Sequence, residues 1–163
     1  MNMQTICKLI GCAGVLVSAV LWGIYKIRTE RRKTDELAAF CDLVGYIGEN
    51  IAHFSKPLPE IYAAYSDKTL SDGGFLAILR KSGMKTATES LAVFHEREVG
   101  GEMLTFASRI GDGYREEQTA LCEYTKSRLG GMLEKRKTAS RDREKLYRTV
   151  PLLVALSVLL MFI

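Results

Sequence analysis

The stretch LAAFCDLVGYIGENIAHF, residues 37–54, decides the fold class of this chain. Its apolar side chains recur at steps of three and four residues, which is the spacing of one face of an α-helix. These positions are Leu37, Phe40, Cys41, Val44, Ile47, Ile51 and Phe54. Thr34 and Asp35 are suited to begin this helix. A long amphipathic helix with one buried stripe is therefore expected here.

Downstream of this stretch the helical period returns in shorter pieces. The segment 55–59, SKPLP, ends one helix and starts the next, because proline fits the first turn of a helix. Ser82-Gly83 closes a further piece, and the residues from Thr86 to Glu89 match a capping box that opens a helix. Gly100-Gly101 separates two more helices. No segment alternates with a period of two, so we expect an all-α bundle of about six helices over residues 34–133.

The last helix loses its apolar face along its length. One packing face is kept at Tyr114, Gln118, Leu121, Cys122, Leu129, Met132 and Leu133. Apolar residues then nearly vanish from 134–145, EKRKTASRDREK. A helix without an apolar face is solvated, so residues 134–149 are predicted to form a charged stalk. Gly130-Gly131 lies where the stalk begins, and the pair favours either a helix break or a hinge.

An apolar run near the N-terminus predicts a transmembrane helix within residues 1–27. Residues 9–25, LIGCAGVLVSAVLWGIY, carry no charge and span roughly 25 Å as a helix, close to the thickness of a bilayer core. The run begins at Leu9, the small residues Gly14 and Ser18 favour packing against another span, and Trp22 and Tyr25 lie where an aromatic belt is expected. The basic segment that follows directly favours a retained span over a cleaved one. A cleavable signal peptide and a lipobox at residues 9–12 are the alternatives.

A second apolar run, VPLLVALSVLLMFI, occupies residues 150–163. It predicts a C-terminal transmembrane helix that contains Pro151, Leu152 and Phe162. The run is short for a span, but it reaches about 18 residues if Arg148 extends its charged end to the interface. A buried core helix is the alternative.

The net charge of +4 is unevenly distributed and indicates topology. Residues 26–33 carry five Lys/Arg and one Glu, and residues 126–148 carry nine Lys/Arg and three Asp/Glu. Residues 34–125 between them carry eight Lys/Arg and fifteen Asp/Glu. Basic segments beside a span stay cytoplasmic and meet anionic lipid, so we expect residues 26–149 in the cytoplasm and no nucleic-acid partner. The membrane-edge cations are Lys26, Arg28, Arg31, Arg32, Lys33, Arg143, Lys145 and Arg148.

The sequence offers few parts for catalysis or metal binding. Its two histidines, His53 and His95, are far apart, and no phosphate-binding glycine loop is present. The acids Asp112, Glu116 and Glu117 either hold a divalent ion or favour the positive end of a helix dipole. We therefore expect no catalytic residue, no cofactor and no metal, and a chain that is not an enzyme.

The cysteines agree with a cytoplasmic central segment. Cys41 and Cys122 are expected to be free thiols that pack as small hydrophobic side chains, because the cytoplasm is reducing. Cys7 and Cys12 fall at or in the first predicted span.

The order of these parts resembles the stage III sporulation protein AB family of endospore-forming bacteria. That family is similar to the cytoplasmic domains of the F-type platform protein of type II secretion. The segments in which the sequence resembles the family are residues 8–11 (KLIG), 54–58 (FSKPL), 104–106 (LTF) and 110–112 (IGD), together with Gln118. The family-like motif residues among them are Pro57, Leu58, Phe106, Gly111, Asp112 and Gln118.

The resemblance implies a non-enzymatic membrane scaffold of the channel between mother cell and forespore. Its cytoplasmic bundle is expected to dock a secretion-type ATPase, and its spans to assemble with other membrane subunits, which leaves room for an oligomer of this chain. The expected location is the mother-cell membrane that faces the forespore. The alternative from another class is a small membrane sensor or regulator, in which the stalk and Gly130-Gly131 transmit a signal.

Overall fold

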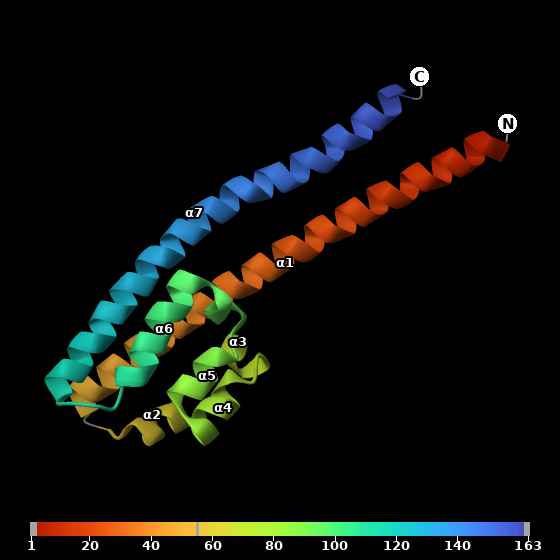
Figure 1. The fold of residues 1–163 in the computed structure, drawn as a ribbon. Coiled ribbons are helices and arrows are strands. Elements are labelled where there is room, and N and C mark those ends of the chain that lie inside the picture. The colour runs from red at the N-terminus through yellow and green to blue at the C-terminus, as the bar shows by residue number, and fades with distance from the viewer. Residues whose placement is uncertain (1–2, 55, 162–163) are drawn as a thin grey trace. The chain divides into compact units, whose positions relative to one another are not determined.

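The computed structural model describes the backbone of residues 3–54 and 56–161, and the side chains of residues 14, 17, 18, 20–54 and 56–140 (Figure 1). This part of the chain is all-α, as predicted, and it contains no strand. It holds seven α-helices, against about six expected, and one short 3-10 helix, η1. In order these are α1 (Met3–Phe54), α2 (Leu58–Ala64), α3 (Lys68–Asp72), α4 (Phe75–Ser82), α5 (Met84–Glu89), η1 (Ala92–His95), α6 (Arg97–Arg109) and α7 (Arg115–Met161).

The chain divides into two compact units. One consists of Met1–Arg31 with Lys137–Ile163, and the other is Arg32–Arg136. The second unit contains α2 to α6, η1 and the adjoining parts of α1 and α7, and it is called the bundle below.

Helix α1 does not begin at Thr34 or Asp35, which corrects the predicted start. It runs without interruption from Met3 to Phe54. Residues 26–36 contain neither glycine nor proline and are rich in Lys, Arg and Glu, which have high helix propensity. The predicted end is confirmed, because α1 stops at Phe54 and α2 begins after Pro57.

The predicted capping box at Thr86 is wrong. Thr86 lies inside α5, which already begins at Met84. Gly83 between α4 and α5 has a φ of +84°, a value that glycine adopts without a steric penalty, and it allows the chain to turn directly from one helix into the next. Thr88, which belongs to the same predicted box, is also inside α5, and its hydroxyl donates to the carbonyl oxygen of Lys85 at 2.8 Å.

The predicted break at Gly100-Gly101 is wrong, because both residues lie within α6. Gly130-Gly131 lies within the continuous α7, which excludes the helix break of the two alternatives and leaves the hinge as a prediction. Gly100 is buried where a Cβ atom would overlap the carbonyl oxygen of Phe94, so this glycine permits the close approach of η1 and α6. At Gly101 a Cβ atom would meet nothing. Packing of the neighbouring backbone therefore decided the role of Gly100, and the helix tolerated both glycines.

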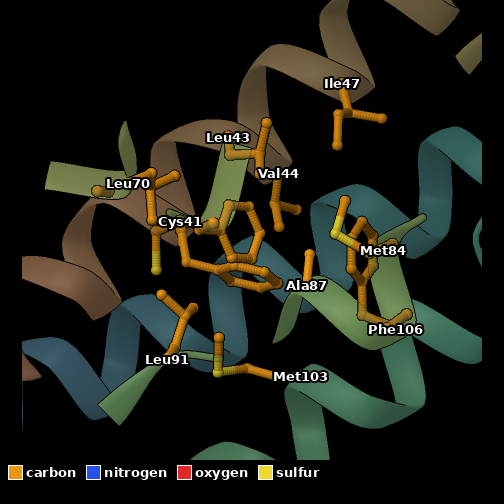
Figure 2. Packing of buried hydrophobic residues seen from close by; sticks show 14 of the residues in the cluster. Cys41, Leu43, Val44, Ile47, Leu70, Met84, Ala87, Leu91, Met103 and Phe106 are labelled. Atoms are coloured by element: carbon orange, nitrogen blue, oxygen red, sulfur yellow. The ribbon is translucent and has the colours of Figure 1, made fainter. Parts of the chain in front are cut away.

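The core of the bundle is built around the predicted stripe of α1. The ring of Phe40 packs edge-on against Phe75 of α4 at 6.2 Å and against Phe106 of α6 at 6.1 Å between ring centroids. All three side chains are fully buried. The same cluster joins α1, α3, α5 and α6 through Cys41, Leu43, Val44, Ile47, Leu70, Met84, Ala87, Leu91, Met103 and Phe106 (Figure 2).

Helices α1 and α7 lie antiparallel inside the bundle. Gly48 of α1 lies so near α7 that an added Cβ atom would stand 3.0 Å from the Cβ of Cys122. Nearer the C-terminal end of α1, Arg115 of α7 donates a hydrogen bond to the carbonyl oxygen of Ala52. Residue numbers thus rise along α1 as they fall along α7. The last turn of α1 and the first turn of α7 therefore share one end of the bundle.

The two cysteines of the bundle are buried free thiols, as expected for small apolar side chains. Burial, with a smaller contribution from Glu123, raises the pKa of Cys122 to about 11. Cys41 belongs to the main core cluster. The side chains of Cys7 and Cys12 lie outside the described part of the structure.

Candidate functional site

The family-like motif residues gather mainly at one end of the bundle. This loop end consists of residues 52–54, 56–58 and 109–118, from the end of α1, the start of α2 and the α6–α7 connection. Pro57 caps α2, and its carbonyl oxygen accepts the N–H of Glu60 at 3.0 Å. Leu58 lies against the connection, since a Cβ atom on Gly111 would stand 3.1 Å from its Cδ1.

Gln118 holds the α6–α7 connection from inside. Its side chain is buried, and its Oε1 accepts a hydrogen bond from the N–H of Gly111 at 2.9 Å. Its Nε2 donates to the carbonyl oxygen of Arg109 at 3.3 Å and to that of Asp112. A single neutral amide therefore binds three backbone groups of the connection, although the carbonyl oxygen of Arg109 also accepts the N–H of Asp112 at 3.2 Å.

Two glycines shape the same connection. Gly111 and Gly113 have φ values of +97° and +102°, in the region that side chains with a Cβ atom rarely adopt. The N–H of Tyr114 donates to Oε2 of Glu117 at 3.4 Å, one turn into α7. The connection therefore has a defined backbone conformation.

Two aromatic side chains at the loop end are largely exposed. Phe54 is 66% exposed and Tyr114 is 79% exposed. The Lys56 ammonium group lies 5.4 Å from the centre of the Phe54 ring. Both aromatics were predicted to lie on buried helix faces, and this is wrong because each stands at a helix terminus, where the covering elements end.

Phe106 lies in the core, whereas the predicted acids Asp112, Glu116 and Glu117 lie at the surface. Phe106 belongs to the core beneath the loop end, and its carbonyl oxygen accepts the N–H of Ile110 at 2.9 Å. Asp112 is exposed, and Glu116 and Glu117 occupy the first turn of α7. Among the described side chains, no group of three or more His, Cys, Asp or Glu is placed to hold a metal ion.

The opposite end of the bundle, called the exit end, is where the chain enters at Arg32 and leaves at Arg136. Glu36 of α1 is 3% exposed there. Its Oε2 accepts the N–H of Val93 in η1 at 3.1 Å, and its Oε1 pairs with Arg32 at 2.9 Å. This carboxylate therefore ties η1 to α1.

A second carboxylate at the exit end ties both long helices together. Oε1 of Glu96 pairs with the Lys33 ammonium group of α1 at 3.2 Å and also with the Arg136 guanidinium group of α7. Burial raises the pKa of Glu96, but hydrogen bonds and attraction from Arg136 and Lys33 outweigh burial, and the pKa lies below its usual value. Arg32 and Lys33, expected at the membrane edge, thus take part in ion pairs within the bundle.

The remaining predicted membrane-edge residues of α1 are solvent-facing. Lys26, Arg28 and Arg31 are exposed, and the Lys26 ammonium group lies 5.6 Å from the centre of the Trp22 ring. Tyr25 is also largely exposed.

The predicted spans are described only in part. The Ser18 hydroxyl donates to the carbonyl oxygen of Gly14 at 2.9 Å, within α1. Over the described residues, none of the helices reaches the length and hydropathy required to traverse a bilayer. The side-chain predictions that lie outside the described part are those for Leu9, Arg143, Lys145, Arg148, Pro151, Leu152 and Phe162.

Sequence reasoning missed Glu36 and Glu96. A signal for Glu36 was present, because it precedes Phe40, Leu43 and Ile47 by four, seven and eleven residues and so lies on the buried face of the helix. Glu96 follows the short apolar stretch 91–95, LAVFH, and its partners come from distant helices. No local pattern pointed to it.

The fold and these two ends define the chain as an all-α helical-bundle protein. A family model described as stage III sporulation protein AB (spore_III_AB) matches residues 8–163. The chain therefore belongs to the stage III sporulation protein AB family, which confirms the resemblance noted from its sequence. No curated protein and no solved structure was found to match it.

Proposed function

We propose that this protein is a membrane scaffold of the channel between mother cell and forespore, and that its bundle docks a secretion-type ATPase. Membership of a stage III sporulation family supports the setting. The resemblance to F-type secretion platforms, which is a prediction from the sequence, is the reason for proposing an ATPase as partner. The observation that carries most weight is the loop end, where a held connection presents Phe54 and Tyr114 to solvent.

Membrane attachment is part of the same proposal. Residues 9–25 carry no charge, and a basic segment follows them directly. Several apolar side chains in this region are exposed in the isolated chain, and a lipid environment would cover them: Val17, Val20, Leu21, Trp22, Ile24 and Tyr25. We propose residues 150–163 as the second span, and the basic segments beside both apolar runs then favour the mother-cell cytoplasm for the bundle.

A scaffold rather than an enzyme fits the side chains of the bundle. His53 and His95, the histidines of the whole sequence, are both exposed. The buried polar side chains of the bundle include Glu36 and Gln118, and both bind backbone groups of their own chain. We propose that the chain acts by binding an ATPase and other membrane subunits, without a cofactor.

The test is co-purification from detergent after co-expression with the sporulation ATPase and the other channel subunits. We expect the ATPase to be retained on the tagged full chain, and the chain itself to stay with the membrane after alkaline carbonate extraction. Lack of ATPase retention with all subunits present would contradict docking. Release by carbonate would contradict the spans.

A further inference from the structure

We propose that the loop end of the bundle is the surface that binds the partner, and that the partner presents an apolar pocket with a basic rim. This inference rests on the proposed function, in which that partner is the ATPase. It assigns to one surface a role that the proposed function leaves to the bundle as a whole.

The loop end is held in place before any partner binds. Gln118 makes three hydrogen bonds to the backbone of the α6–α7 connection, and Arg115 ties α7 to the last turn of α1. A surface that is already ordered loses little conformational entropy on binding. The connection can therefore present Tyr114 at low entropic cost.

The exposed side chains are of the kind that carry binding energy. Phe54 and Tyr114 belong to segments that the Arg115–Ala52 hydrogen bond joins. Aromatic residues dominate the energetic centres of protein interfaces because they bury a large area with few rotatable bonds. Both side chains are too exposed to contribute much to the core, so their apolar area is available to a partner.

The position of the loop end suits a cytoplasmic partner. The chain enters and leaves the bundle at Arg32 and Arg136, at the exit end. The part of α1 from Lys33 to Phe54 is about 32 Å long at 1.5 Å per residue, so the loop end is a full bundle length away. If both long helices lead to spans, a large soluble protein reaches this end without meeting the bilayer.

The charges around the loop end select the chemistry of the partner. The loop end itself has three exposed acidic side chains, Asp112, Glu116 and Glu117, and three exposed basic ones, Lys56, Arg109 and Arg115. The adjoining turns of α1 and α2 add the exposed Glu49 and Glu60, so acidic side chains are in excess over this surface as a whole. A complementary partner therefore has basic groups around its apolar pocket, since complementary potentials favour association and orient it.

The experiment compares the full chain with the F54A/Y114A double variant in detergent, with purified ATPase as the probe. We expect the double variant to bind at least tenfold more weakly. Tyr124→Ala is the matched control, because Tyr124 is a 57% exposed aromatic residue of α7 outside the loop end. It should change affinity less than twofold. Asp112→Lys, a charge reversal without loss of apolar area, should weaken binding severalfold and increasingly so at low salt.

The outcomes separate this inference from the proposed function. If the unaltered chain binds and the double variant binds equally well, the loop end is not the docking surface, but the scaffold proposal stands. If the unaltered chain does not bind, the scaffold proposal itself fails. A double variant that changes the oligomeric state of the chain, or its binding to anionic vesicles, with unchanged ATPase affinity would assign the surface to a second copy or to lipid and overturn the inference.

Discussion

At the exit end of the bundle two carboxylates hold the structure together, whereas at the loop end a neutral amide does. Glu36 and Glu96 bind backbone and cationic groups from three elements, α1, η1 and α7. Gln118 binds three backbone groups of one connection. Ion pairs therefore hold the exit end, whereas a neutral amide makes most of the hydrogen bonds to the α6–α7 connection, beside single bonds from Arg115 and to Glu117.

The difference has a physical meaning for a bundle whose first and last helices both continue beyond it. The exit end joins segments that would otherwise separate, and like charges on Lys33 and Arg136 would repel without the shared carboxylate of Glu96. The loop end instead keeps one short connection in a single conformation. Ionic contacts thus unite distant helices, and neutral hydrogen bonds shape a surface.

The largest effect is expected at the exit end, for Gly100→Ala. The added methyl group would overlap the backbone carbonyl of Phe94, which cannot move without displacing η1, and overpacking of this kind costs about 3 kcal/mol. The free energy of unfolding by denaturant measures it. Gly101→Ala is the control, where the methyl group meets nothing and better helix propensity should stabilise the bundle by up to about 1 kcal/mol. Equal effects of the two changes would contradict the close approach.

The second largest effect is expected for Glu36→Ala, which should lower the free energy of unfolding by about 2–3 kcal/mol. The change leaves the buried N–H of Val93 without its acceptor and removes a charge-assisted hydrogen bond. Amide hydrogen exchange of η1 should accelerate more than that of α2. Retention of full protection at Val93 would show that the carboxylate does not hold η1.

At the loop end, Gln118→Ala should lower the free energy of unfolding by about 2 kcal/mol, because three hydrogen bonds to a partly exposed connection are lost. Unfolding by denaturant measures it. Gln118→Glu keeps the acceptor for Gly111 but turns a carboxylate oxygen toward the carbonyl oxygens of Arg109 and Asp112, so at neutral pH it should destabilise the bundle at least as much as Gln118→Ala. The difference between the unaltered chain and Gln118→Ala should stay constant between pH 4 and pH 8. Strong dependence on pH would erase the contrast between the two ends.

The smallest effect is expected for Glu96→Gln, which should lower the free energy of unfolding by less than about 1 kcal/mol near neutral pH. The ion pair of Glu96 with Lys33 is partly exposed and screened by solvent. The pKa of Glu96 is lowered in the folded state, so its contribution is present above the ordinary glutamate pKa and is lost as pH falls through the lowered value. Urea unfolding of the variant and the unaltered chain should therefore converge in acid. A gap that widens in acid would contradict this sign.

Sequence periodicity predicted much of the core but little of the two ends. The buried positions Phe40, Val44 and Ile47 followed from spacing alone, and Gln118 was correctly placed on the packing face of its helix. Phe54 shared that spacing and is exposed, because periodicity does not reveal where covering elements stop. The role of Gly100 escaped prediction for a related reason: the pattern of one helix contains nothing about the backbone that approaches it.

The sequence by itself determined the all-α class, the buried stripe of α1 and the turn at Pro57, since each depends on residues within a few positions of one another. The tertiary structure alone decided which groups meet at the exit end. Glu36 and Val93 are 57 residues apart, and Glu96 lies 63 residues from Lys33 and 40 from Arg136. Such contacts arise from the packing of whole helices, which no local spacing encodes.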